Sequence, residues 1–419
     1  MMLGIDFGTS NSAAALVDGN GRLVRIPLEG DTPSMPTALF FSSEDGRVHY
    51  GSAALRAYLS GEEGRLMRSI KSLLGSALMD ETTLVNGRPT TLFEIVVMFF
   101  RELKARSETF LGHPVHAAML GRPVHFVDDD LPRDDLAQAT LERAARAAGF
   151  ETVAFQLEPI AAAFDFERSV GAETTVLVVD IGGGTSDFTV VRVRPGEPAS
   201  GDRAKDILAT TGVHIGGTDF DQRLSLRHVM PLLGLGHVGA SGREVPSPIF
   251  FRLSTWHLIH QCYSRSNMHD AADLRHLYAD RTLHRRLMRV LHAHDGHRIL
   301  AGVEAAKIAW SNAGVETPLD LDRIEHSLVA KLSPAGLGET LQDRLDTVVA
   351  CARACVQAAG IGRPEAVYMT GGSSALAPLG AALKVAFPGA RTVTGDRFGS
   401  VVAGLATHAS RQDPALASG

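Results

Sequence analysis

The sequence predicts an α/β protein made of two related lobes. A short apolar strand, an Asp and a glycine- and hydroxyl-rich turn occur at residues 5–11 and again at residues 179–187. Segments whose apolar residues recur every three or four positions, as in helices, separate strand-like segments throughout the chain. Strands mixed with helices are typical of an α/β fold, and 419 residues suffice for two lobes with inserts.

The first repeat is expected to form an antiparallel meander. A strand over residues 3–7 leads through the turn 8–12 into a second strand over 13–17. The chain then turns at residues 18–21, where Asn and Gly supply the positive φ of tight turns, and a third strand covers 23–27. The hairpin therefore presents its glycine-rich turn near the start of the chain.

The second repeat has the same pattern. Residues 174–179 are β-branched and apolar, Asp180 and the turn 181–187 follow, and a strand resumes over 188–193. Later, residues 366–369, 370–374 and 377–387 indicate a strand, a glycine turn and a helix. Other helices are expected over 132–149, from Glu158 onward and over 341–360.

Residues 222–302 differ from the rest because they are rich in His and Arg. They are expected to be mostly helical, with a loop over 234–248. The G-x-G-x-x-G at 234–239 follows no strand, so we interpret it as loop rather than as a dinucleotide site. The segment 292–297 contains three His and one Asp, and we expect a solvated loop rather than a metal site.

Composition limits the classes of function. Apolar residues make up 45% and charged residues 21%, and the net charge is −6, which argues against a nucleic-acid or anionic-membrane partner. Three cysteines cannot form a disulfide framework, and no zinc-ligand Cys spacing occurs. No apolar run reaches the ~20 residues of a membrane span, and no leader-like segment precedes the first strand. We expect a cytoplasmic protein.

The two glycine-rich turns suit phosphate binding. Backbone N–H groups at such turns bind phosphate oxygens, and the missing side chains allow a close approach. The hydroxyls of Thr9, Ser10, Thr185 and Ser186 would add donors. Two aspartates, Asp6 and Asp180, offer hard oxygen ligands that can hold Mg²⁺ through water. No Gly-Lys pair occurs in the sequence, which excludes a P-loop.

The order of these motifs resembles the actin/hexokinase/heat-shock ATPase superfamily, and within it the nucleotide-binding domain of DnaK-type (Hsp70) chaperones. The matching segments, in the family's order, are residues 4–12, 158–163, 179–187, 212–221 and 370–374. The stretch 216–221 is the most discriminating, and the resemblance is closest to the short YegD-type chaperones. It implies an actin-like ATPase fold with duplicated ribonuclease-H-like topology and inserted subdomains around a central nucleotide cleft.

The resemblance also implies ligands and residue roles. ATP or ADP with Mg²⁺ would bind in the cleft. The residues expected to act in catalysis are Lys71, Glu158, Asp180, Thr185 and Asp187, with Asp6 and Asp180 ordering the Mg²⁺ waters. Those expected to contact the nucleotide are Gly8, Thr9, Ser10, Asn11, Gly182, Gly183, Gly184, Gly216, Gly217, Glu304, Lys307, Ser311, Gly371, Gly372, Ser373 and Asp396. A Lys beside the γ-phosphate can position water and offset developing charge.

The sequence departs from the family pattern at three places. Ile308 stands where the family has an adenine-stacking Arg, which puts base affinity and discrimination between ATP and ADP in doubt. Leu157 and Ile160 replace polar residues of the segment that connects the lobes. After residue 410 we expect only a polar tail, 411–419, and no peptide-binding domain.

We expect lobe I to comprise residues 1–172 and about 391–410, with an insert at about 37–111. Lobe II would comprise 173–390, with an insert at about 222–319. The expected function is that of an ATPase switch with weak hydrolysis that acts on an unidentified protein partner or client. A sugar or polyol kinase of the same superfamily and an actin-like filament protein remain alternatives, and the sequence leaves the oligomeric state open.

Overall fold

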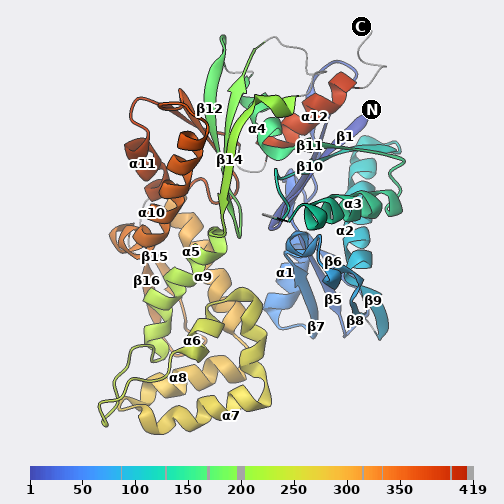
Figure 1. Cartoon of the computed structure of the whole chain (residues 1–419). Coiled ribbons are helices and arrows are strands. Elements are labelled where there is room, and N and C mark those ends of the chain that lie inside the picture. The colour runs from blue at the N-terminus through green and yellow to red at the C-terminus, as the bar shows by residue number, and fades with distance from the viewer. Residues whose placement is uncertain are drawn as a thin grey trace. The chain divides into compact units, whose positions relative to one another are not determined.

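The structure is a computed structural model of the chain (Figure 1). It describes residues 1–419 except 86, 128–129, 168–169, 196–202, 314–315, 333, 397–398 and 413–419. Its contacts divide it into two compact units. Unit 1 comprises Met1–Val213, Cys351–Ser374 and Lys384–Gly419, and unit 2 comprises His214–Ala350 and Ala375–Leu383. This division differs from the expected lobes because unit 1 contains both large sheets, and the lobe boundaries stay a prediction.

The first large sheet of unit 1 has the order β11-β10-β1-β2-β3, and β4 pairs with the start of β2, before the part of β2 that pairs with β3. Strands β1, β2 and β3 form the expected antiparallel meander, whereas β10 runs parallel to β1 and β11 parallel to β10. The strands are β1 (Met2–Phe7), β2 (Asn11–Val17), β3 (Leu23–Arg25), β4 (Ser34–Pro36), β10 (Ala117–Arg122) and β11 (Thr152–Leu157).

The second sheet repeats this topology with the order β14-β13-β12-β17-β18. Again the first three strands form an antiparallel meander, and two parallel strands extend the sheet beside the first strand. The strands are β12 (Thr174–Ile181), β13 (Ser186–Val193), β14 (Ile207–Val213), β17 (Ala366–Thr370) and β18 (Arg391–Thr394). The duplicated ribonuclease-H-like topology expected from the motif repeat is thus present, as is the actin-like α/β fold.

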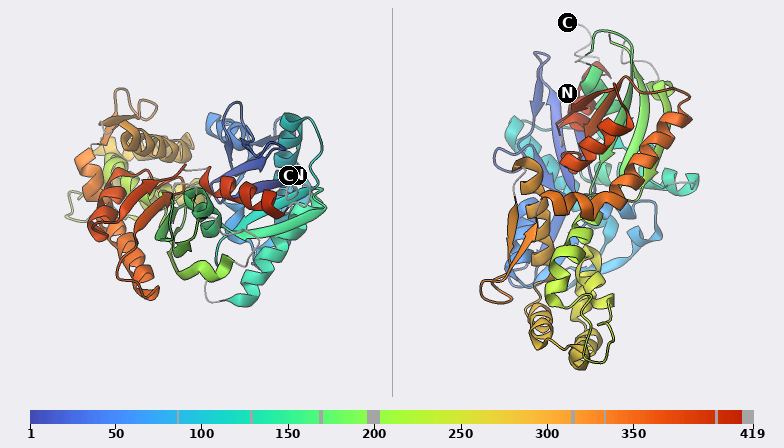
Figure 2. Two further views of the ribbon diagram at one scale, coloured as in Figure 1. Left: turned by 90° about the horizontal axis from the view of Figure 1, so that it is seen from above. Right: turned by 90° about the vertical axis from the view of Figure 1, so that its left-hand side faces the viewer.

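Equivalent helices follow the two sheets along the chain. The first half contains α2 (Leu92–Leu111), α3 (Leu131–Ala147) and α4 (Glu158–Glu167); the second contains α10 (Pro334–Ala358), α11 (Ala377–Ala386) and α12 (Ser400–Gln412). α4 and α12 pack on each other, and α12 also packs on β1 and β2 of the first sheet (Figure 2). α4 in turn contacts β12 and β13 of the second sheet. The last helix of each half therefore packs on the sheet of the other half.

Two glycines permit this close packing. A Cβ at Gly4 of β1 would come 2.6 Å from the backbone nitrogen of Ala406, and one at Gly404 would overlap the carbonyl oxygen of Ala161. Small and apolar side chains fill the rest of the contact, including Ala13, Ala15, Val402 and Ala406. A side chain at Gly4 would displace α12 from β1, and one at Gly404 would displace α12 from α4.

An insert between β3 and β10 carries two small sheets. The three-stranded one has the order β6-β5-β7, and the two-stranded one pairs β8 with β9. Its elements are β5 (Ala38–Ser42), β6 (Val48–Tyr50), α1 (Gly51–Ser60), β7 (Gly64–Arg68), the 3-10 helices Ile70–Leu73 and Ala77–Asp80, β8 (Thr82–Val85) and β9 (Arg88–Thr91). The 3-10 helix Ile70–Leu73 carries Lys71.

Unit 2 is mostly helical, as expected for residues 222–302, and it contains one hairpin. Its α-helices include α5 (Gly217–Leu224), α6 (Pro248–Leu253), α7 (Arg265–Asp273), α8 (Arg281–His292) and α9 (Gly296–Ala313), and its hairpin joins β15 (Thr317–Asp320) to β16 (Val329–Leu332). Most of α10 and of α11 also belongs to this unit. A π-helix, Ser225–Val229, and three 3-10 segments, Met230–Leu233, Trp256–Tyr263 and Leu274–Leu277, connect these helices. The G-x-G-x-x-G segment is a loop, with Gly234 in the left-handed region at φ 113°.

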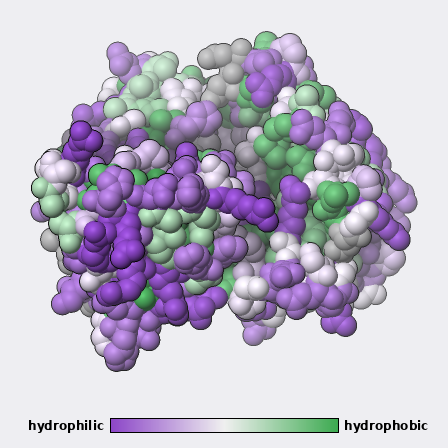
Figure 3. Space-filling view, turned by 90° about the horizontal axis from the view of Figure 1, so that it is seen from below, coloured by the Kyte–Doolittle hydropathy of each residue, from purple (hydrophilic) through white to green (hydrophobic). Residues whose placement is uncertain are grey.

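The face of the molecule in Figure 3 is mainly polar. Hydrophilic residues predominate on the face in Figure 3, with smaller hydrophobic areas between them. Within the described part of the chain, every helix is too short or too polar to cross a membrane. Residues 411–412 end α12, and the remainder of the expected tail, 413–419, lies outside the described residues.

Candidate functional site

The first glycine turn joins β1 to β2 and is braced from one side by Thr37. The Thr37 hydroxyl donates to the Gly8 carbonyl over 2.8 Å, and its backbone N–H donates to the Ser10 carbonyl over 2.9 Å. A Cβ at Gly8 would overlap the backbone oxygen of Asn11. The turn from Gly8 to Asn11 is therefore fixed in one tight conformation that only glycine allows at its first position.

The second glycine turn joins β12 to β13 and is braced by the turn that follows β17. The Gly182 N–H donates to the Thr185 carbonyl over 2.9 Å, which closes the turn. The Ser373 hydroxyl donates to the Gly182 carbonyl over 3.3 Å, and the Ser373 N–H donates to the Ile181 carbonyl over 3.0 Å. The predicted phosphate residues 182–185 and 371–373 are thus parts of one bonded structure.

The two turns meet inside unit 1. A Cβ at Gly183 would overlap the hydroxyl oxygen of Ser10. The residues that sequence reasoning assigned to phosphate binding from two separate hairpins therefore lie side by side. Gly371, at φ 84°, closes the arrangement, because a Cβ there would overlap a carboxylate oxygen of Asp180.

A buried ion pair lies next to these turns. Lys71 Nζ is 2.7 Å from Glu158 Oε1, and the two side chains are only 10% and 14% exposed. Glu158 is the first residue of α4 and Lys71 lies in the insert, 87 positions earlier. Burial disfavours the charge of Lys71, but Glu158 and Asp6 together hold its pKa above the usual value. The lysine is therefore a fixed positive charge.

The two predicted metal-side aspartates are partly buried and interact electrostatically with this pair. Burial, followed by repulsion from Glu158, raises the pKa of Asp6 to about 7, while Lys71 acts in the opposite direction. Burial, followed by repulsion from Asp187, Glu158 and Asp6, raises the pKa of Asp180 well above its usual range. One lysine thus faces several carboxylates, and its charge offsets their repulsion only in part.

This donor set fits Mg²⁺. The ion takes hard oxygen ligands, keeps several of its waters and needs only one or two carboxylates from the protein. Asp6 and Asp180 are partly buried carboxylates that lack enough positive charge around them, and a divalent cation would supply it. Thr185 lies at the same edge, where its hydroxyl donates to Asp187 Oδ2 over 2.9 Å.

The residues expected to contact adenosine belong to unit 2. Lys307 of α9 forms a buried ion pair with Asp221, Nζ to Oδ1 2.8 Å, and also donates to the Gly217 carbonyl over 3.1 Å. The Gly216 N–H, just before α5, donates to Asp219 over 2.9 Å. Lys307 thus ties α9 to the start of α5, a structural role that the sequence pattern did not indicate.

The other residues of α9 at the expected adenosine site are Glu304, Ile308 and Ser311. Glu304 is half-buried, the Ser311 hydroxyl donates to the Lys307 carbonyl over 2.8 Å, and Ile308 is 45% exposed. Asp396, expected on the nucleotide side, belongs to unit 1, where it pairs with Arg25 of β3 at 2.6 Å. Residues 397–398 of its motif lie outside the described residues.

One expectation for the His-rich region is only half right. In the segment 292–297 the residues 292–294 are exposed, as in a solvated loop, whereas Asp295 and His297 are only 4% and 7% exposed. The His297 ring donates to the Trp256 carbonyl over 2.9 Å, and the His294 ring stacks on Tyr263 with 4.1 Å between centroids. These histidines help to pack the short helices of unit 2. Their partners are aromatic residues about 30 to 40 positions earlier in the sequence.

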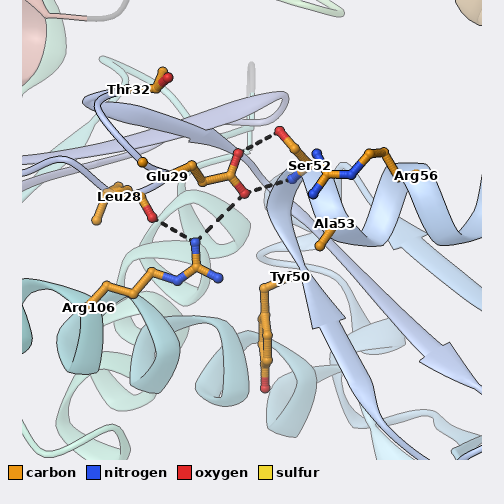
Figure 4. Close-up of a pocket in the computed structure, with 9 residues that line it drawn as sticks. Leu28, Glu29, Thr32, Tyr50, Ser52, Ala53, Arg56 and Arg106 are labelled. Carbon is orange, nitrogen blue, oxygen red and sulfur yellow. Dashed lines mark hydrogen bonds and ion pairs between the residues drawn. The ribbon is translucent and has the colours of Figure 1, made fainter.

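A pocket of about 500 Å³ lies elsewhere in unit 1, at the start of α1 (Figure 4). Glu29 accepts hydrogen bonds from the Ser52 N–H and hydroxyl at 2.8 and 2.5 Å. Arg106 of α2 donates to the Leu28 carbonyl over 2.7 Å and lies 3.7 Å from Glu29. Because Glu29, Ser52 and Arg106 bond to one another or to the Leu28 carbonyl, we interpret the pocket as a structural junction between the 28–32 loop, α1 and α2.

The duplicated topology, the facing glycine turns and the Lys–carboxylate cluster are features of the actin-like ATPase fold class. The sequence matches the family model of the Hsp70 protein over residues 2–231, more than half of the chain. The chain therefore belongs to the Hsp70 family.

A curated relative supports this membership. The chaperone protein DnaK of Endomicrobium trichonymphae is 33% identical over 229 residues, which are 53% of this chain and 34% of that protein. The match thus spans about a third of the relative's length.

Proposed function

We propose that this protein binds Mg-ATP and hydrolyses it slowly, acting as a nucleotide switch of the chaperone type. The observation that carries the proposal is the partly buried cluster of Asp6, Lys71, Glu158 and Asp180 beside two glycine turns that touch each other. Such turns bind phosphate oxygens, and such a cluster suits a divalent cation and a charged phosphoryl group.

In this proposal the phosphates are held by backbone N–H groups and hydroxyls of the two turns. Glycines at 8, 182 and 183 let the backbone approach the phosphate oxygens, while Thr9, Ser10 and Thr185 add hydroxyl donors. The bracing by Thr37 and Ser373 keeps the donors in place before the nucleotide arrives. Preorganised donors cost little reorganisation when charge develops in the reaction.

Lys71 and Glu158 act on the attacking water in this proposal. Lys71 remains charged because Glu158 and Asp6 raise its pKa, so it offsets negative charge that develops on the γ-phosphoryl group. Glu158, held at 2.7 Å by Lys71, accepts a hydrogen bond from the water and orients it. Bound Mg²⁺, held by Asp6 and Asp180 through water, would neutralise phosphate charge. The nucleotide state would then be communicated to a protein partner or client.

The test is ATP turnover by the purified chain, measured as phosphate release with Mg²⁺ present. Asp180→Asn removes one partly buried carboxylate with little change of shape, and we expect turnover to fall about 100-fold. The matched control is Asp135→Asn on the exposed face of α3, which should leave turnover unchanged.

Calorimetric ATP binding measured on the same proteins separates binding from chemistry. Equal binding and turnover in Asp180→Asn and the parent would contradict the assignment of the cluster. The assay is repeated with a panel of sugars and polyols, since phosphate transfer that depends on one of them would make the protein a kinase. Sedimentation with ATP tests for filaments.

A further inference from the structure

A second group of metal-ligand side chains lies in the insert of unit 1, away from the cluster described above. Asp45, His49 and Glu62 each offer one ligand atom, and these atoms lie within 4.8 Å of one another. We propose that Asp45, His49 and Glu62 form a binding site for a transition-metal dication, with Zn²⁺ as the best-fitting ion. The proposal is independent of nucleotide binding.

The three ligands come from three separate segments. Asp45 lies in the turn between β5 and β6, His49 lies on β6, and Glu62 lies between α1 and β7. Because consecutive elements supply them, neither a Cys pattern nor an H-x-x-x-H pattern marks the site in the sequence. This explains why sequence reasoning missed it.

Main-chain hydrogen bonds hold the two ligand-bearing connections together. The Ser43 N–H donates to the Glu63 carbonyl over 2.8 Å, and the Glu63 N–H donates to a Glu44 carboxylate oxygen over 3.1 Å. Gly61, in the left-handed region at φ 91°, ends α1 and turns the chain toward Glu62. The backbone of the site is thus already ordered around the ligands.

Of the three residues, His49 gives the strongest indication that a metal ion binds here. Its ring lies 6.2 Å from that of Phe40, its cross-strand partner in β5, and its Nε2 atom is buried. That atom makes no hydrogen bond to any residue that the structure describes, and Glu62 Oε1 is 3.9 Å away. A buried imidazole nitrogen without a partner costs free energy, which a metal bond would recover.

The donor set selects the class of ion. An imidazole nitrogen with two carboxylate oxygens suits Zn²⁺ and its transition-metal neighbours, whereas Mg²⁺ and Ca²⁺ favour oxygen donors alone. Zn²⁺ bonds of about 2.0–2.2 Å place tetrahedral ligand atoms about 3.4 Å apart, so the ligand atoms need to approach one another by at most about 1.4 Å. Asp45 is exposed and can make that movement, after leaving Arg47, which lies 3.4 Å from it.

Zinc binding is tested by calorimetry and elemental analysis on the full chain, stripped with chelator and titrated with ZnCl₂ alone. We expect about one tight equivalent, and about 100-fold weaker binding at this site in His49→Gln and in Asp45→Asn. The control His326→Gln removes an exposed His that pairs only with Asp322 in the described structure, and it should retain the equivalent. Asp180→Asn should retain it too, which separates this site from the proposed nucleotide site.

Circular dichroism in the presence of chelator checks that each variant folds. Asp45→Asn is less apt to disturb the fold than His49→Gln, because Asn can still accept the hydrogen bond that the Arg47 N–H donates to Asp45 over 2.9 Å. A shift of Tm by Zn²⁺ in the parent that disappears in Asp45→Asn would support the site. The absence of a saturable equivalent in the parent, or equal binding by the parent, His49→Gln and Asp45→Asn, would overturn it.

Discussion

The two halves of unit 1 share one topology but use it differently at the ends of their central strands. In the first half, β10 ends beside β1 at Gly121, where a Cβ would come 3.1 Å from Glu158 Cγ. In the second half, β17 ends beside β12 and leads into Gly371, where a Cβ would overlap Asp180. Each half therefore omits a side chain next to one carboxylate of the cluster.

The halves differ in what holds their glycine turns. The first turn is braced by Thr37, which precedes β5, and the second by Ser373, which follows β17. The insert of the first half also contributes Lys71, whereas the insert of the second half forms most of unit 2. The duplicated topology thus gives two similar sheets with glycine turns. The inserts give the two halves different functional side chains.

The largest expected effect concerns Lys71, which only the first half supplies. Lys71→Ala should lower the rate of ATP turnover by about 100-fold or more while ATP still binds, because the positive charge beside the phosphoryl group is lost. Phosphate release and calorimetric ATP binding measure the two effects. The control Lys384→Ala alters an exposed lysine of α11 and should behave like the parent. Full activity of Lys71→Ala would reduce this residue to a structural partner of Glu158.

A comparison of Gly371→Ala with Gly121→Ala tests the two strand ends directly. At Gly371 the left-handed φ and the overlap with Asp180 should cost about 1–3 kcal/mol of unfolding free energy and weaken ATP binding. At Gly121 the new methyl meets side-chain atoms of Glu158 and Leu405 at 3.1 and 3.3 Å and no backbone atom, so stability should stay within about 1 kcal/mol of the parent. Urea unfolding measures both variants, and equal losses would show that the two ends are equivalent.

The last prediction concerns an ion pair at the end of β10. Arg122 Nη2 lies 2.7 Å from Asp134 Oδ2, and the Phe126 N–H donates to the other oxygen of Asp134. Burial tends to raise the pKa of Asp134, but these hydrogen bonds hold it below its usual value. A lowered folded-state pKa means that the pair stabilises the fold above about pH 4 and that this contribution disappears as the pH falls further.

Asp134→Asn should therefore destabilise the protein by about 2 kcal/mol at pH 7 and lose part of the parent's acid sensitivity. Urea unfolding at pH 7 and at acid pH provides the measurement. An unchanged pH dependence in Asp134→Asn would contradict the role of this pair.

Much of the fold could be predicted from local patterns. The two strand–turn–strand repeats revealed the duplicated meanders, because alternation and glycine turns are local signals. The start of α4 at Glu158 also followed from local signals, since Pro159 lies in its first turn and Glu158 itself suits a helix N-terminus. The helical character of residues 222–302 was likewise confirmed.

Other features depend on contacts that sequence does not display. The ion pair of Lys307 with Asp221 joins two helices of unit 2, and His297 is buried against Trp256. The group of Asp45, His49 and Glu62 arises only when three connections of the insert meet. Such convergence is set by tertiary structure, and no spacing along the chain encodes it.

The exchange of α4 and α12 has a consequence for synthesis of the protein. The face of the first sheet that α12 covers includes Ala13 and Ala15, whereas the residues that cover it, Val402 and Ala406, lie almost 400 positions later in the chain. The first sheet can bury this face only after α12 has been synthesised. We therefore expect the nascent first half to expose apolar surface until α12 has left the ribosome, and a chain truncated before residue 400 to be a substrate for quality control.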